Sequence, residues 1–161
     1  DVIEALVGLL SQEYRVRELG GHFDTARFVS EWVKRDLLNV AFANSDNHGR
    51  NTALLKTPQG IWLAPVYDFA PMNADPEGII RTTTWGAPFE EGPEFSWVAI
   101  TENLNAYVPA EQLMAELKAL GSQLAGLKER LAARGVPEAL LASNAVGLNY
   151  LDAKLRRWGL V

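Results

Sequence analysis

A run of eight mostly polar residues, 44–51, directly follows a stretch with helical apolar spacing. It contains Asp46 and Asn51, five positions apart, among residues that favour turns over regular structure. A second short run, Tyr67-Asp68-Phe69, comes at the end of a later apolar stretch. This feature constrains the fold most, because polar groups with a chemical task must be held on a rigid support.

The segment between the two runs predicts a β-hairpin. Residues 52–56 and 61–64 are short apolar-rich stretches separated by Thr57-Pro58-Gln59-Gly60. Pro58 at the second turn position and Gly60 at the fourth suit a type I turn. We therefore expect Asp46 and Asn51 before the hairpin and Asp68 just after it.

This order of groups is the order found in protein kinases. There, a metal-binding Asn follows the catalytic Asp by five residues, and a hairpin leads to an Asp-Phe-Gly whose Asp holds Mg²⁺. ATP concentrates negative charge, and carboxylate and amide oxygens suit the Mg²⁺ that bridges its phosphates. We predict Asp46 as catalytic base and Asn51 and Asp68 as metal ligands. Singly, each is an ordinary turn or cap residue, so the three predictions stand together.

Three neighbouring residues are further candidates. His48 stands where conventional kinases place a Lys near the transferring phosphate, and we expect it to contact phosphate or substrate, or to order the loop. Arg50 is a candidate for a phosphate or substrate contact, with a solvated surface role as the alternative. Asn44 is expected to support the loop backbone. His22 and His48 share no metal-ligand spacing, so no two-histidine metal site is predicted.

The polar run, with Trp62-Leu63-Ala64-Pro65-Val66-Tyr67-Asp68, resembles the C-terminal kinase domain of HipA-like proteins, which are bacterial serine/threonine kinases that act as toxins. The motifs cover roughly residues 30–72. The resemblance implies a mainly α fold with a small β-hairpin, the C-terminal lobe of a protein-kinase-like fold. It also implies ATP and Mg²⁺ as cofactors, an aminoacyl-tRNA synthetase as a possible protein substrate, and a helix-turn-helix antitoxin (HipB-like) as partner. DNA contact would then be indirect, through the antitoxin.

Some residues depart from the kinase pattern and leave alternatives open. Ser45 replaces the Arg of His-Arg-Asp, and Ala70 replaces the Gly of Asp-Phe-Gly. The Asp46-x-His48-x-x-Asn51 spacing also resembles small-molecule kinases of the aminoglycoside or choline type, although those usually carry His where this chain has Asn44. A third possibility is a degenerate kinase fold that acts as a binding module. The presence of both carboxylates and the amide argues against it.

Length and composition agree with one domain spanning residues 1–161. The net charge of −5 argues against a general nucleic-acid binder, and the lack of cysteine excludes disulfides and zinc–thiolate sites. No apolar run of about 18 residues and no signal pattern occur, so we expect a cytoplasmic protein with no membrane contact. No glycine-rich phosphate loop precedes the polar run. We therefore expect a C-lobe whose N-lobe lies outside this chain, inactive in isolation.

Apolar spacing predicts helices over about 2–19, 24–44, 95–104, 109–135 and 137–158. Residues 71–94 are rich in Pro and Gly, with one β-like patch at 79–83. In a kinase this segment takes the position of the activation segment. The alternative is a surface-packed loop.

Overall fold

The computed structural model describes residues 2–13, 17–18 and 20–161. Its central element is helix α3 (Thr25–Ala41), which begins after Asp24. The Asp24 side chain accepts a hydrogen bond from the backbone N–H of Arg27 and so satisfies one of the free donors of the first turn. The predicted helix leading to the polar loop is thereby confirmed. Its core-facing side buries Phe28, Val29, Val33, Leu37 and Ala41.

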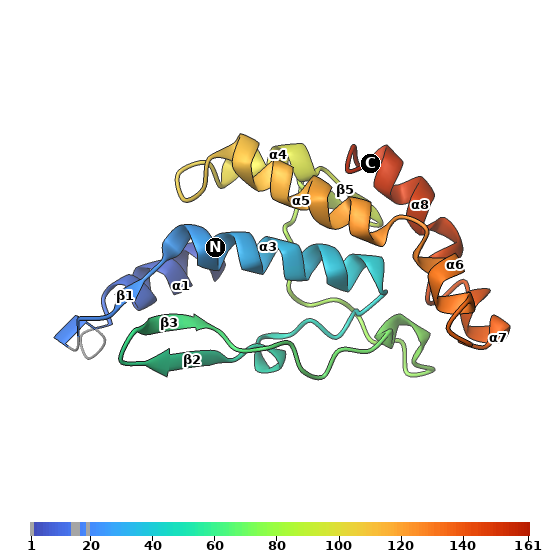
Figure 1. Cartoon of the computed structure of the whole chain (residues 1–161), viewed down its shortest axis with the longest axis horizontal. Coiled ribbons are helices and arrows are strands. Elements are labelled where there is room, and N and C mark those ends of the chain that lie inside the picture. The colour runs from blue at the N-terminus through green and yellow to red at the C-terminus, as the bar shows by residue number, and fades with distance from the viewer. Residues whose placement is uncertain (1, 14–16, 19) are drawn as a thin grey trace.

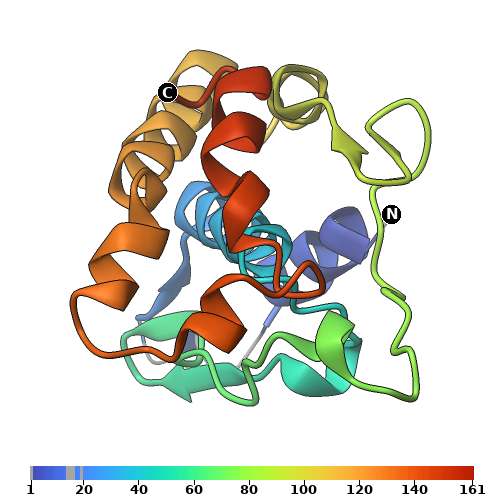
Figure 2. The same ribbon diagram turned by 90° about the vertical axis from the view of Figure 1, so that its right-hand side faces the viewer.

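Helix α3 lies between two layers (Figure 1). On one side is a small sheet, and on the other are helices α4 (Trp97–Asn103), α5 (Ala110–Leu124) and α8 (Leu148–Arg157). Figure 2 shows the same arrangement turned by 90°, with the sheet below α3 and the helices above it. The helical layer supplies much of the core, through Trp97, Ile100, Leu113, Leu117 and Leu155. This packing fixes α3 and with it the start of the polar loop.

The sheet contains β1 (His22–Phe23), β2 (Leu54–Thr57) and β3 (Gly60–Leu63) in the order β1-β3-β2. Strands β2 and β3 are antiparallel, so the predicted hairpin is confirmed. Strand β1 pairs with β3 in parallel and places His22 opposite Gly60. A Cβ atom on Gly60 would overlap the His22 carbonyl oxygen, so glycine permits this close approach.

Two predicted long helices are interrupted. Residues 109–135 form α5 and α6 (Leu127–Ala132), separated at Gly126, whose φ is 65°. The carboxylate of Asp152 accepts a hydrogen bond from the Gly126 N–H at 3.0 Å. Residues 137–158 form α7 (Glu138–Leu141) and α8, with Gly147 at a φ of 75° before α8. The prediction of continuous helices was wrong in both places. The left-handed Gly126 separates α5 from α6, whereas α7 already ends at Leu141 and the left-handed Gly147 only precedes α8.

The remaining segments differ from prediction in detail. Helix α1 (Val2–Ser11) is shorter than the predicted helix over 2–19, of which residues 14–16 and 19 lie outside the described residues. The segment 71–94 contains the 3₁₀ turn η2 (Met72–Ala74) and strand β4 (Glu90–Glu91), which pairs with β5 (Glu94–Phe95). The β-like patch at 79–83 forms no strand. Within the described chain, no helix has the length and apolarity needed to cross a membrane.

Candidate active site

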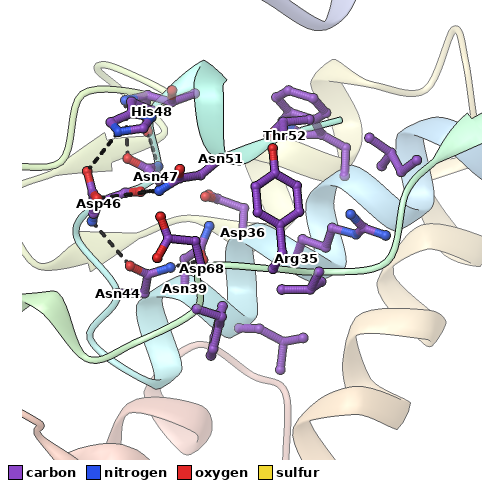
Figure 3. Close-up of a pocket in the computed structure, with 17 residues that line it drawn as sticks. Arg35, Asp36, Asn39, Asn44, Asp46, Asn47, His48, Asn51, Thr52 and Asp68 are labelled. Atoms are coloured by element: carbon purple, nitrogen blue, oxygen red, sulfur yellow. Dashed lines mark hydrogen bonds and ion pairs between the residues drawn. The ribbon is translucent and has the colours of Figure 1, made fainter. Parts of the chain in front are cut away.

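A cleft lies between the C-terminal half of α3, the polar loop and the residues that follow β3 (Figure 3). Five of the six predicted site residues line it: Asn44, Asp46, His48, Asn51 and Asp68. Arg50 does not line it, and its side chain is exposed. The other lining residues are Trp32, Arg35, Asp36, Leu38, Asn39, Asn47, Thr52, Leu63, Val66, Tyr67, Phe69 and Thr83.

The polar loop leaves α3 through a well-defined helix end. Ala43 follows the C-cap Phe42 and has a φ of 53°. The N–H of Ala43 bonds to the carbonyl of Val40, and the N–H of Asn44 bonds to the carbonyl of Asn39 at 2.8 Å. This is the pattern of a Schellman motif, in which the residue after the C-cap is left-handed and usually glycine. The motif turns the chain from the helix axis into the loop.

Asn44 holds the first part of the loop in place. Its side chain is buried, its Nδ2 donates to Asn39 Oδ1 at 3.0 Å, and its Oδ1 accepts from the backbone N–H of Asp46 at 3.2 Å. Both ends of the amide are therefore used. They tie the Asp46 backbone to the last turn of α3.

Asp46, His48 and Asn51 form one connected group. Asn51 Nδ2 donates to the Asp46 carbonyl oxygen at 2.9 Å and lies 3.4 Å from Asp46 Oδ2. His48 Nε2 lies 3.3 Å from Asp46 Oδ1. The 3₁₀ turn η1 (Gly49–Asn51) brings Asn51 back toward Asp46. Each carboxylate oxygen of Asp46 thus has a fixed neighbour, which restricts the orientation of the group.

Asp68 enters the cleft from the far end of the hairpin (Figure 3). Its φ is 51°, a left-handed conformation that Asp tolerates better than most residues and that is common at functional sites. Its neighbours fix it on both sides. The Tyr67 hydroxyl donates to the Arg50 carbonyl at 2.7 Å, and the Phe69 ring packs edge-on against Phe42 at 5.6 Å between ring centroids.

The segment after Asp68 is attached to both the loop and α3. Asn47 makes two hydrogen bonds with the Thr83 backbone, donating to its carbonyl at 2.7 Å and accepting from its N–H at 3.3 Å. Arg81 Nη2 donates to both oxygens of the buried Asp36 on α3, at 2.8 and 2.6 Å. These contacts place the segment along one side of the cleft.

The Arg81 ion pairs are largely shielded from solvent. Arg81 Nε also donates to Glu90 Oε1 at 3.0 Å, and the exposed fractions of the three side chains are 15%, 9% and 8% for Arg81, Asp36 and Glu90. Burial alone would lower the pKa of Arg81, but Asp36 and then Glu90 outweigh it, so this pKa is raised. Trp85 adds a hydrogen bond from Nε1 to Asp36 Oδ2 at 2.7 Å.

Sequence reasoning missed Asp36, Asn47 and Thr83 as part of the cleft. The burial of Asp36 could have been predicted from the sequence, because this residue follows Val33 by three positions and so falls on the apolar side of α3. A carboxylate there must be buried and paired. Asn47 and Thr83 are 36 residues apart, and no local pattern predicts their contact.

Together these features define a mainly helical kinase-like fold, in which a polar loop and a carboxylate beyond a short hairpin meet at one cleft. The family model of the HipA-like C-terminal domain matches residues 12–126, more than half of the chain. The chain therefore belongs to the HipA-like C-terminal domain family. No curated protein and no solved structure gives a significant match.

Proposed function

We propose that this chain contributes the catalytic groups for ATP- and Mg²⁺-dependent phosphoryl transfer to a protein Ser or Thr, as in a HipA-like toxin kinase. The observation that supports this most directly is the convergence of Asp46, Asn51 and Asp68 on one cleft. They come from opposite ends of the β2–β3 hairpin, which gives the group a short and rigid support.

The residues present fit a magnesium ion. Asn51 uses its nitrogen on Asp46, which leaves its oxygen as the free end of the amide. The Asp68 side chain is exposed in the cleft and makes no hydrogen bond or ion pair within the described structure. No group of three or more His, Cys, Asp or Glu side chains in the described residues forms a complete metal cage. Mg²⁺ needs none, because it commonly takes one or two protein carboxylates and completes its shell with water and phosphate oxygens.

In this proposal Asp46 orients the attacking hydroxyl and accepts its proton. Bound Mg²⁺ would supply the positive charge that stabilises the transferring phosphoryl group, with Asn51 and Asp68 as its protein ligands. His48 holds Asp46 Oδ1 through Nε2, and its Nδ1 is buried, so of the two expected roles the proposal gives His48 the ordering of the loop around Asp46. Arg50, on the exposed turn beside the cleft, is a contact for the incoming substrate.

The partners follow from the family rather than from the cleft. We propose an aminoacyl-tRNA synthetase as protein substrate, a helix-turn-helix antitoxin as partner, and the cytoplasm as the place of action. The net charge of −5 favours DNA contact through the antitoxin over direct binding by this chain.

The test separates binding from transfer in the complete protein. Asp46→Asn and Asp68→Asn are compared with Glu102→Gln, a control that neutralises an exposed acid on α4. ATP binding is measured with and without Mg²⁺. Transfer is measured with γ-labelled ATP and a panel of aminoacyl-tRNA synthetases.

We expect Asp46→Asn to reduce transfer by roughly 10²-fold or more while Mg²⁺-dependent binding persists. Asp68→Asn should lose the Mg²⁺-dependent part of ATP binding, and Glu102→Gln should change neither. Transfer that survives Asp46→Asn would overturn the proposal. A wild type that shows no Mg²⁺ effect on ATP would indicate a binding module, and transfer only to small hydroxyl compounds would indicate a small-molecule kinase.

A further inference from the structure

Asn47 directly follows Asp46 in the polar loop, and the proposed reaction gives it no role. It lines the active-site cleft together with Thr83 of the segment 71–94. Its side chain hydrogen-bonds to Thr83 and to no other described residue. Within the described structure it is also the only residue of the polar loop, 44–51, that hydrogen-bonds to the segment 71–94. Hydrogen bonding between these two parts of the chain therefore depends on one amide side chain.

The two hydrogen bonds pair the Asn47 amide with the backbone of a single residue. Asn47 Nδ2 donates to the Thr83 carbonyl oxygen at 2.7 Å, and Asn47 Oδ1 accepts from the Thr83 N–H at 3.3 Å. Directly paired residues of antiparallel strands exchange the same two bonds. Two bonds to one residue fix the orientation of its backbone as well as its position. Among side chains, only the amides offer a neutral donor and an acceptor side by side, so Asn is suited to this contact.

The segment is fixed on both sides of Thr83 independently of Asn47. Two positions earlier, Arg81 Nη2 donates to the two oxygens of Asp36 on α3 at 2.8 and 2.6 Å. Two positions later, Trp85 Nε1 donates to Asp36 Oδ2 at 2.7 Å. Both contacts are made to a buried residue of the central helix. Thr83 therefore has a fixed place at the side of the cleft, and loss of the Asn47–Thr83 contact would release the loop rather than the segment.

The two proposed metal ligands are held by other contacts. Asn51 is held by the hydrogen bond from its backbone N–H to the His48 carbonyl at 2.9 Å, and Asp68 by its place beyond the β2–β3 hairpin. Asp46, in contrast, is joined to Asn47 by a peptide bond, so the contact of Asn47 restricts the backbone that carries the Asp46 carboxylate. Loss of this contact should therefore disturb the proposed base more than the metal ligands.

We propose that Asn47 is a positioning residue that sets the distance between Asp46 and the side of the cleft formed by Thr83. The inference rests on the proposed function, because the acceptor hydroxyl of a protein substrate must reach Asp46 while the chain around it lies against a neighbouring surface. Thr83 and its anchored neighbours form that surface in this proposal. A misplacement of about 1 Å can cost roughly 10²-fold in rate, so the Asn47–Thr83 contact affects transfer. It does not affect the binding of Mg²⁺ and ATP.

The test compares Asn47→Ala with Asn73→Ala in the complete protein. Asn73 is the matched control, because its Nδ2 also donates to a distant backbone carbonyl, that of Ala145 at 3.1 Å, from the same segment but outside the cleft. The acceptor is the synthetase of the panel that the wild type phosphorylates. We expect Asn47→Ala to lower kcat for this acceptor about tenfold or more, while the Kd for Mg²⁺-ATP changes less than about twofold. Asn73→Ala should change each value less than about twofold.

A second measurement follows the Asn47–Thr83 contact without any substrate. Hydrogen exchange of the backbone amides of Thr83 and Asp46 should become at least about threefold faster in Asn47→Ala and should not change in Asn73→Ala. The inference alone is overturned if the wild type phosphorylates a synthetase and the two variants transfer at equal rates, or if only the Thr83 amide exchanges faster. Equal losses of Mg²⁺-ATP binding and of transfer in Asn47→Ala would show a merely structural role and would also overturn it. A wild type without transfer to any protein overturns the proposed function and this inference together.

Discussion

The side-chain nitrogen of Asn51 lies 2.9 Å from the carbonyl oxygen of Asp46 and 3.4 Å from its Oδ2. The same amide therefore has one end engaged with the proposed base and the other end free to face the proposed metal. The two functions of the cleft, proton acceptance and metal binding, meet in this one side chain.

Substitutions of Asn51 should distinguish the role of its side-chain oxygen from the role of its side-chain nitrogen. Asn51→Ala removes both, and we expect the Mg²⁺-dependent part of ATP binding to weaken about tenfold or more, with transfer lost. Asn51→Asp keeps an oxygen for the metal but replaces the donor to Asp46 with a like charge. Metal-dependent binding should then persist while transfer falls. ATP titrations with and without Mg²⁺ measure the difference, with Asn103→Ala, an exposed residue of α4, as control. Equal binding by the Ala variant and wild type would contradict a metal role.

The ion pairs of Arg81 should dominate the stability of the segment after Asp68. Arg81→Gln leaves the buried carboxylates of Asp36 and Glu90 without their cation, and we expect a loss of roughly 3–5 kcal/mol in the free energy of unfolding. Arg157→Gln is the matched control. Its ion pair with Glu94 is equally short, at 2.8 Å, but both side chains are more than half exposed. It should cost less than about 1 kcal/mol. Urea unfolding measures both, and similar losses would contradict this ranking.

The parts of the molecule that could be predicted from sequence are those determined by short-range patterns. Helix α3, the hairpin and the presence of Asp46, Asn51 and Asp68 in one region all followed from spacing over at most a few tens of residues. The short helix end, turn and hairpin that connect these residues allow few relative positions for their side chains. The order of elements along the chain was therefore enough to predict that they lie close together.

The parts that could not be predicted depend on contacts between distant residues. Arg81 pairs with Asp36 across 45 positions, and Asp152 stabilises the helix break at Gly126 across 26 positions. Strand β1 has only two residues, too few to show an alternating pattern. In each case the partner is chosen by packing in three dimensions, which a single sequence does not display.

A substitution at the helix end that leads into the polar loop should make the fold more stable. Ala43 adopts a φ of 53° in a position where glycine is preferred. Ala43→Gly removes the steric cost of a side chain in the left-handed region, and we expect a gain of about 1 kcal/mol, or roughly 2–4 °C in Tm. Ala119→Gly, on an exposed position inside α5, should instead lose about 1 kcal/mol, because there glycine only adds freedom to the unfolded chain. Thermal unfolding followed by circular dichroism compares the two, and changes of the same sign would contradict the role of the left-handed position.

Because Lys154 is partly buried, its titration should make the stability of the fold change with pH in the alkaline range. Burial and Arg157 lower its folded-state pKa below the usual 10.5. Between these two values the unfolded chain binds more protons than the folded one, so this residue makes stability rise with pH across that window. Below the window the folded state carries the full cost of the buried charge, and above 10.5 the cost is gone.

Lys154→Met removes the titration, so its Tm advantage over wild type should be largest near neutral pH and should shrink toward pH 10.5. Arg156→Met should differ from wild type by an amount that does not change with pH. A Tm difference between Lys154→Met and wild type that stays constant from pH 7 to 10.5 would show that Lys154 titrates normally in the folded chain.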